Sequence, residues 1–294
     1  MAYSFHFDNN AQISIDEFVD WVEANVDFND EASILSSAHK IHQLSNNKFL
    51  LDGIITSTLK DVNDGVQRAN VYTDATFILA MSSEKPFFVR ANVWKTPKLR
   101  NGTYDWENQH YSYLFPHDHN FDFMTVGYHG SGYRTEIYEY EYDKIGGFPG
   151  ESINLKFLED TRLEKGKVMF YRKSRDLHIQ HPPESLSISL NLMTRDIGKG
   201  LRQQYEFDTK NRKIANYVSG DISLRCALIE MAAELASDNA LDVLQQLARN
   251  HICQRTRMTA FSGLLKSSKI DRNALYNDIE KDQSIVVRSM LGAL

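Results

Sequence analysis

The sequence predicts a mainly β protein with added helices, in which a central β-barrel lies between two helical regions. Apolar residues recur at helical spacing in residues 13–65, and again from residue 218 onward. Between them, residues 70–210 contain short runs of β-branched and aromatic residues, separated by residues that favour turns. We therefore predict N-terminal helices over residues 1–65, the barrel over 66–212 and C-terminal helices over 213–294.

The N-terminal region is predicted to form three helices that cap the barrel. In the first, at about residues 13–26, apolar residues repeat every three to four positions. Ser14, followed three residues later by Glu17, has the pattern of a capping box at the start of that helix. Two further helices are expected at about residues 30–43 and 49–62. Their apolar faces favour packing on a neighbouring sheet.

The central region is predicted to consist of antiparallel strands. The clearest strand patterns occupy residues 85–94, 121–142, 167–173 and 185–193. Between Tyr128 and Tyr133 we expect a hairpin turn in which Gly130 and Gly132 adopt positive φ. Several short strands joined by such turns are typical of a barrel or a sandwich.

The C-terminal region contains a weak internal repeat. Arg225, Arg257 and Arg288 each begin a helical segment, at spacings of 32 and 31 residues. This pattern resembles HEAT-type helical hairpins, and an ordinary helical bundle is the alternative. Either interpretation makes residues 218–294 a packing surface or a surface for a protein partner.

Composition excludes several classes of function. The net charge is −6, which does not favour binding to nucleic acid or to an anionic membrane. No apolar run approaches the roughly 18 residues that a membrane span requires. The first residues lack a basic and apolar leader, and Cys226 and Cys253 form no CxxC pair, which predicts a reduced cytoplasmic protein.

Histidines carry the strongest chemical signal in the chain. His117 and His119 flank Asp118, and side chains at positions i and i+2 of a strand point to the same face. Neutral imidazole is the commonest metal ligand in proteins. A later strand region offers His178 and His181, either of which would complete a three-point site that leaves positions open for ligands.

This arrangement resembles the cupin superfamily of jelly-roll β-barrels, and within it the three-histidine thiol dioxygenases such as cysteine dioxygenase. The likeness spans about residues 70–193, and His117-Asp118-His119 is its sharpest motif. The family's third ligand is a histidine in a Leu-His pair, which Leu177-His178 matches and which favours His178 over His181. The resemblance implies a jelly-roll barrel with Fe(II) on three histidines, which oxidises its substrate with dioxygen.

The sequence also departs from that family. Phe123 and Met124 replace the usual cupin glutamate, which favours a site without a carboxylate ligand. Asp74 occupies the position where the thiol dioxygenases have an arginine that clamps the substrate carboxylate, which argues against free cysteine as substrate. An insertion of about twenty residues, 96–115, separates Trp94 from the histidine motif.

Three further residues are candidates for a catalytic role. Arg90 would bind a substrate anion if its face of the strand points into the barrel. Asn191 replaces a histidine that the family has on its last strand. Tyr128 and Tyr133 flank the hairpin, where either could donate a hydrogen bond to substrate or dioxygen, or pack between strands.

The resulting hypothesis is a non-haem Fe(II) oxygenase that acts on a small amino-acid-like substrate, free or borne on a peptide or carrier protein. One alternative is a cupin enzyme that uses another metal for non-oxidative chemistry. Another is a ligand-sensing cupin whose C-terminal helices bind a partner protein.

Overall fold

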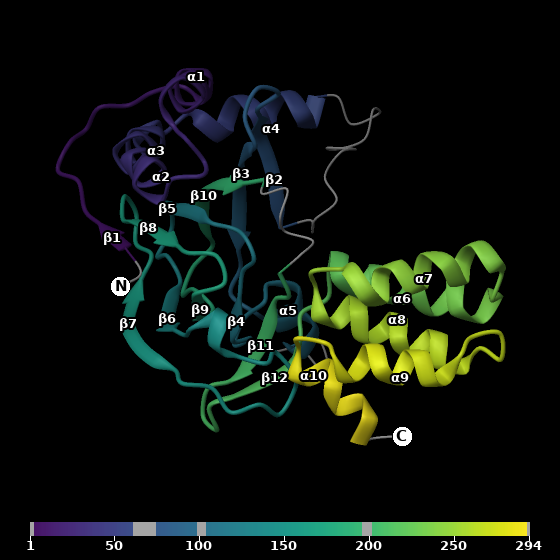
Figure 1. Cartoon of the computed structure of the whole chain (residues 1–294). Coiled ribbons are helices and arrows are strands. Elements are labelled where there is room, and N and C mark those ends of the chain that lie inside the picture. The colour runs from purple at the N-terminus through teal and green to yellow at the C-terminus, as the bar shows by residue number, and fades with distance from the viewer. Residues whose placement is uncertain (1–2, 61–74, 99–103, 196–201, 293–294) are drawn as a thin grey trace. The chain divides into compact units, whose positions relative to one another are not determined.

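A computed structural model describes residues 3–60, 75–98, 104–195 and 202–292 (Figure 1). The chain forms two compact units, the first made of Met1–Tyr140 and Leu155–Asp196, the second of Glu141–Asn154 and Ile197–Leu294. The N-terminal helices and the main sheets thus belong to one unit. The predicted boundary between residues 65 and 66 lies outside the described residues, and the second unit begins before residue 213.

Four helices lie in the N-terminal region of the chain. They are α1 (Ile15–Asn25), α2 (Glu31–Ser36), α3 (Ala38–Asn46) and α4 (Leu50–Lys60). The capping box is confirmed, because the Glu17 N–H donates to Ser14 Oγ at 3.1 Å and the Ser14 N–H donates to the Glu17 carboxylate at 2.7 Å. The predicted helix over 30–43 is instead two helices, which meet at Ser37.

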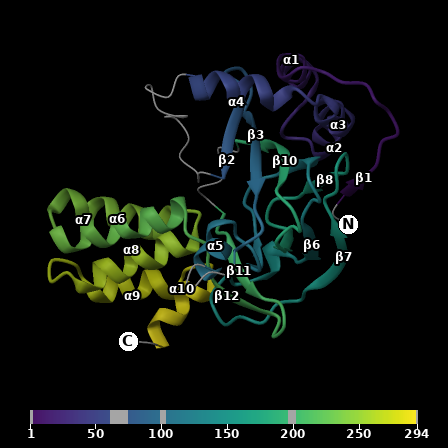
Figure 2. The same cartoon turned by 180° about the vertical axis from the view of Figure 1, so that it is seen from behind.

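The first unit also contains two antiparallel sheets (Figures 1 and 2). The larger sheet has the order β1 (Tyr3–Phe5), β8 (Val168–Tyr171), β5 (Phe123–His129), β10 (Ser187–Thr194), β3 (Phe87–Trp94) and β2 (Thr76–Met81). In the smaller sheet, β4 (His117–Asp118), β9 (Asp176–Gln180), β6 (Arg134–Glu139) and β7 (Lys156–Arg162) lie in that order. Each of the four predicted strand segments overlaps at least one of these strands.

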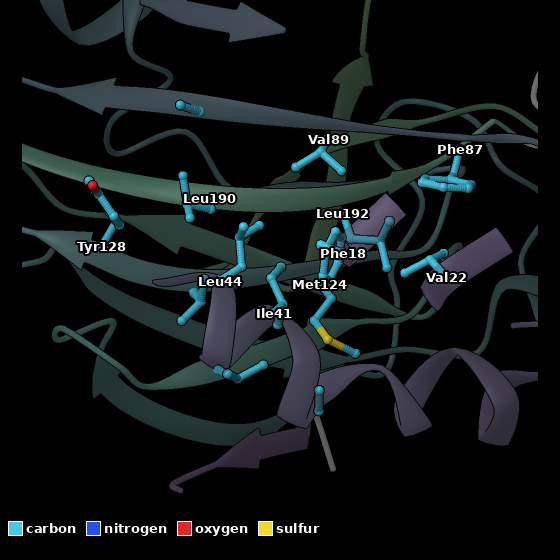
Figure 3. Close-up of a cluster of buried hydrophobic side chains, with 14 of the residues drawn as sticks. Phe18, Val22, Ile41, Leu44, Phe87, Val89, Met124, Tyr128, Leu190 and Leu192 are labelled. Carbon is cyan, nitrogen blue, oxygen red and sulfur yellow. The ribbon is translucent and has the colours of Figure 1, made fainter. Parts of the chain in front are cut away.

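The alternation of side chains along the larger sheet creates two apolar layers. One face packs against helices α1 and α3, where Val22 and Ile41 contact the same buried cluster as Val89 and Leu192 (Figure 3). Side chains of the other face join residues of the smaller sheet in a second cluster, which includes Phe88, Trp94, Phe123, Ile137 and Met193. The parity of a residue in its strand therefore decides whether it faces the helices or the space between the sheets.

The hairpin between β5 and β6 has the predicted conformation. Gly130 has a φ of 84° and Gly132 a φ of 70°, so both lie in the left-handed region. A β-carbon at either position would collide with backbone atoms, of Leu186 at Gly130 and of Leu163 at Gly132. This turn places Tyr133 beside the second apolar cluster.

The second unit combines a hairpin with helices. Its elements are η2 (Tyr142–Lys144), β11 (Tyr205–Asp208), β12 (Lys213–Tyr217), α6 (Asp221–Leu235), α7 (Asp238–Asn250), α8 (Gln254–Lys266), α9 (Arg272–Glu280), α10 (Ile285–Arg288) and η4 (Ser289–Gly292). Leu244, Phe261, Leu264 and Ile279 contribute to one buried cluster among these helices. The helices confirm the change from strand to helix near residue 218, and the HEAT-type repeat stays an interpretation. None of the helices in the described ranges is long and apolar enough to cross a membrane.

Candidate metal centre

Three histidines lie close together, two on strands of the smaller sheet and one in the residue after β4. His117 and His178 are directly paired in the register of β4 and β9, and His119 follows β4. One ligating nitrogen from each of the three rings lies within 4.8 Å of the other two. Within the described ranges, this is the one cluster of histidine, cysteine or acidic groups suited to hold a metal ion.

Strand alternation explains why the middle residue of the motif is absent from the cluster. His117 and His119 project to one side of the chain, and Asp118 projects to the other. Asp118 is fully buried there and accepts a hydrogen bond of 2.6 Å from the hydroxyl of Tyr140. Asp118 therefore anchors the strand that carries the two histidines, and its carboxylate is not among the candidate ligands.

Burial favours the neutral form of His117 and His178. It lowers the pKa of His117, and it lowers the pKa of His178 further, with a contribution from the nearby His117. The Nδ1 of His117 lies 2.8 Å from the carbonyl oxygen of Phe115, so Nδ1 donates its hydrogen and Nε2 keeps its lone pair. A neutral ring with a free nitrogen lone pair is the form that binds a metal ion.

The spacing of the nitrogens fits a single ion. The Nε2 atoms of His119 and His178 lie 3.1 Å apart. Two nitrogens at about 2.1 Å from one ion, at angles of roughly 90–109°, would be separated by about 3.0–3.4 Å. The ring of Phe123 packs edge-on against His119, with ring centroids 4.9 Å apart, so an apolar side chain and not a carboxylate lies beside this histidine. The donor set therefore consists of nitrogen alone.

A cavity of about 200 Å³ adjoins the three histidines. Arg90 and Asn191 both line this cavity. The face of the strand that carries Arg90 therefore points inward, which is the condition on which its predicted role depends. The other lining residues are Ala75, Thr76, Asn92, Val93, Trp94, His110, Tyr111, Ser112, Phe123, Tyr133 and Gln180. None of the lining residues in the described ranges is acidic, so Arg90 supplies the fixed charge of this wall.

Asn191 lies in the sheet directly beside Arg90. The two residues are paired across β10 and β3, and Asn191 is 4% exposed. Its amide nitrogen lies 3.3 Å from the side-chain oxygen of Asn92 and 3.4 Å from the backbone oxygen of Arg90. Asn191 and Asn92 therefore form a polar strip next to the guanidinium.

Tyr133 also lines the cavity. Its ring lies 4.8 Å from that of Trp94, and burial raises its pKa to about 12. The hydroxyl is therefore protonated at neutral pH and able to donate a hydrogen bond. Gln180 was not singled out from the sequence, although it shares the face of β9 with His178 at position i+2 and so could have been found.

The structure does not bring Tyr128 to the cavity, contrary to the expectation of a catalytic role. Tyr128 lies on the face of β5 that packs against the helices, in the same cluster as Met124 (Figure 3). Its hydroxyl donates a hydrogen bond of 2.9 Å to the backbone oxygen of Asn47, which follows α3. The reason is parity, because Tyr128 shares its face of the strand with Met124 and Val126.

Replacement of Tyr128 by Phe is expected to change stability and leave the metal centre intact. Loss of its hydrogen bond to Asn47 should lower the free energy of unfolding by about 0.5–1.5 kcal/mol. Urea unfolding and metal analysis of the purified variant measure the two effects. A large loss of metal in the folded variant would contradict this placement of the side chain.

Three further histidines occupy different positions. His181 lies after β9, with its Nε2 at 2.9 Å from Glu136, and it is not part of the cluster. His129 is exposed in the hairpin, whereas His110 lines the cavity. Asp74, at the position of the arginine clamp, lies outside the described residues.

Comparisons with known proteins give partial structural matches. No protein-family model matches the sequence, and no curated protein matches it. Salicylate 1,2-dioxygenase from Pseudaminobacter salicylatoxidans is 10% identical, with a TM-score of 0.28 over 53% of this chain and 36% of that chain. DMSP lyase DddQ from Ruegeria pomeroyi DSS-3 is 11% identical, with a TM-score of 0.23 over 42% of this chain and 47% of that one.

A third match is the hydroquinone 1,2-dioxygenase PnpCD, at 9% identity and a TM-score of 0.27, over 44% of this chain and 68% of that chain. The chain spans about half the length of the DMSP lyase chains, at 52% and 47%. We therefore infer the function from the side chains of the site itself.

Proposed function

We propose that this chain is a non-haem Fe(II) oxygenase of the cupin type, with iron on His117, His119 and His178. The observation that carries this proposal is the 3.1 Å separation of the Nε2 atoms of His119 and His178 within the group of three histidines. Such a spacing suits two ligands of one ion. Burial without an acidic neighbour also disfavours two protonated imidazoles at that distance.

The donor set favours a metal that reacts with small ligands. Three neutral nitrogens leave the charge of a divalent ion uncompensated, and an adjoining cavity gives a ligand access. Iron bound there would supply redox chemistry with dioxygen, at the positions that the protein leaves open. The side chains around the cavity would determine which substrate reaches that position.

We propose a small acid as the substrate, amino-acid-like and either free or borne on a peptide or carrier protein. Arg90 would pair with its anionic group, and the amide of Asn191 would orient the same group. The protonated hydroxyl of Tyr133 would donate a hydrogen bond to the polar group nearest the histidines. The rings of Trp94 and Phe123 would exclude water.

Oxygen uptake separates this function from a cupin that performs non-oxidative chemistry on another metal. Iron-loaded protein is expected to consume dioxygen in the presence of its small-acid substrate, and zinc-loaded protein is not. An oxygen electrode, applied to a panel of amino acids and short carboxylates, makes the measurement. Turnover by the zinc or manganese form without oxygen uptake would support the non-oxidative alternative and contradict our proposal.

A second candidate function is a ligand sensor whose helices bind a partner protein. The observation in its favour is α6, where Leu224, Leu228, Met231 and Leu235 are each more than half exposed on one face. For this function, Leu228→Glu should abolish a complex with the partner and leave the metal content unchanged. Oxygen-dependent turnover of the full chain without a partner would favour the oxygenase instead.

A further inference from the structure

A row of aromatic rings leads from the protein surface to the cavity. It lies in α5 (Tyr104–His110) and the residue that follows, within the insertion 96–115. Trp106 is 61% exposed and stacks on His110, with ring centroids 4.9 Å apart and planes at 19°. His110 meets Tyr111 edge-on at 4.8 Å. Because His110 and Tyr111 line the cavity and Trp106 does not, the row joins the solvent to the cavity.

Hydrogen bonds hold this segment in place on both sides. The Lys98 N–H donates to the Glu107 carboxylate at 2.6 Å, and the Leu114 N–H donates to the Gln180 oxygen at 2.8 Å. The Tyr113 hydroxyl donates a hydrogen bond of 2.9 Å to the backbone oxygen of Lys95. The exposed indole of Trp106 is thus carried on an anchored segment, and it presents a large apolar face to water.

The turn after α5 is held in an uncommon backbone conformation. Ser112 and Leu114 have φ values of 53° and 57°, in the left-handed region that residues with a β-carbon rarely adopt. Strain of this kind persists where the surrounding structure imposes it, and it is frequent at ligand sites. Ser112 itself lines the cavity, which places this strained turn at the ligand space.

The size of the cavity limits what it can enclose. Its volume is about 200 Å³, whereas pockets that bury a drug-sized ligand measure about 300–1,000 Å³. The polar side chains of Arg90, Asn92 and Asn191 suit a small anionic head group inside. The remainder of a larger ligand would lie outside, next to the rings that continue from the cavity.

We propose that Trp106 and His110 form an outer subsite, which binds a flat aromatic tail of a substrate whose anionic head lies in the cavity. This inference rests on the proposed function, since the head group is placed beside the histidines. The stacked pair offers a planar face, and aromatic rings prefer offset-stacked or edge-on contacts with such a face. A saturated chain would make a weaker contact with this planar face.

The test uses carboxylates with and without a ring. Acetate, phenylacetate, phenylpropionate, phenylbutyrate and phenylhexanoate are titrated by calorimetry into the iron-loaded full chain under argon. We expect the phenyl carboxylate of one tether length to bind most tightly. Trp106→Ala should weaken the affinity for that compound about 2- to 12-fold and leave the affinity for acetate unchanged. Trp106→Phe should retain most of the higher affinity for the phenyl compound, because phenylalanine keeps an aromatic ring.

Phe157→Ala is the matched control, since Phe157 is an aromatic residue of the same unit, 54% exposed and absent from the cavity lining. It should change no affinity. The inference is overturned if Trp106→Ala leaves every affinity unchanged, or weakens acetate by the same factor. It is also overturned if a trimethylammonium carboxylate of the best tether length binds as tightly as the phenyl compound, because the subsite would then select a cation.

Failure of the subsite and failure of the proposed function are distinguishable. If the chain holds no metal but phenylalkanoate binding still depends on Trp106, the subsite stands and the oxygenase proposal fails. If metal and acetate bind normally but no tail depends on Trp106, the subsite alone is wrong.

Discussion

Protein with the substitution His178→Ala is expected to retain less than a tenth of the iron that the wild-type chain binds. His178 comes from a different strand than the other two histidines, so its loss leaves only His117 and His119. Its nitrogen is 3.1 Å from that of His119, the separation that two ligands of one ion require. Metal analysis of protein purified without chelator, then loaded with iron and desalted, measures the retained amount.

The matched control is His181→Ala. His181 is only three residues further along the chain, but its ring contacts Glu136 and lies outside the cluster. This variant should bind iron as the wild type does. Equal iron loss in both variants, or none in either, would contradict the assignment of the third ligand to His178.

The second large effect concerns the helical unit, where Arg257 and Asp282 form a buried ion pair. Arg257 is 4% exposed and donates to both carboxylate oxygens of Asp282, at 2.7 and 2.8 Å. It also donates to the backbone oxygens of His251 and Ile252. Arg257→Ala would leave the carboxylate and two carbonyl groups without this partner, which should lower the free energy of unfolding by about 3–5 kcal/mol.

Urea unfolding followed by circular dichroism measures this loss. The control is Arg249→Ala, because Arg249 pairs with Asp278 at the surface, where such a pair contributes about 0–1 kcal/mol. Equal small losses in both variants would contradict the importance of the buried pair.

The same pair predicts a dependence of stability on pH. Burial alone would raise the pKa of Asp282, but hydrogen bonds from Arg257 and from the Ser284 N–H outweigh it and lower the pKa below its usual value. The contribution of Asp282 is therefore present above the pKa of the unfolded state and is lost as the pH falls through the folded pKa. In Arg257→Ala, this acid-induced loss should be smaller.

Local patterns predicted the individual elements well. The capping box at Ser14 and the positive φ values of Gly130 and Gly132 depend on residues that are close in sequence. The histidine cluster was also predictable, because His117 and His119 are two apart on a strand and the cupin likeness supplied His178. A short motif determines the geometry of the capping box, of the turn and of the His117–His119 pair.

The errors concern relations across the fold. A tyrosine next to a hairpin can face either side of its sheet, and the sequence around Tyr128 does not say which side carries the helices. Arg90 was ambiguous for the same reason, and the structure places it on the inner face. The grouping of residues 141–154 with the C-terminal helices depends on contacts between distant segments, such as the Gly150 N–H with the Ile214 oxygen at 2.8 Å.

X-ray absorption at the iron edge of the loaded wild-type protein tests the metal centre most directly. We expect one iron per chain, with three imidazole nitrogens at about 2.1 Å. The spectrum of the His178→Ala variant should show one imidazole ligand fewer. A ligand shell without imidazole, or a spectrum unchanged by His178→Ala, would contradict an iron centre on these three histidines.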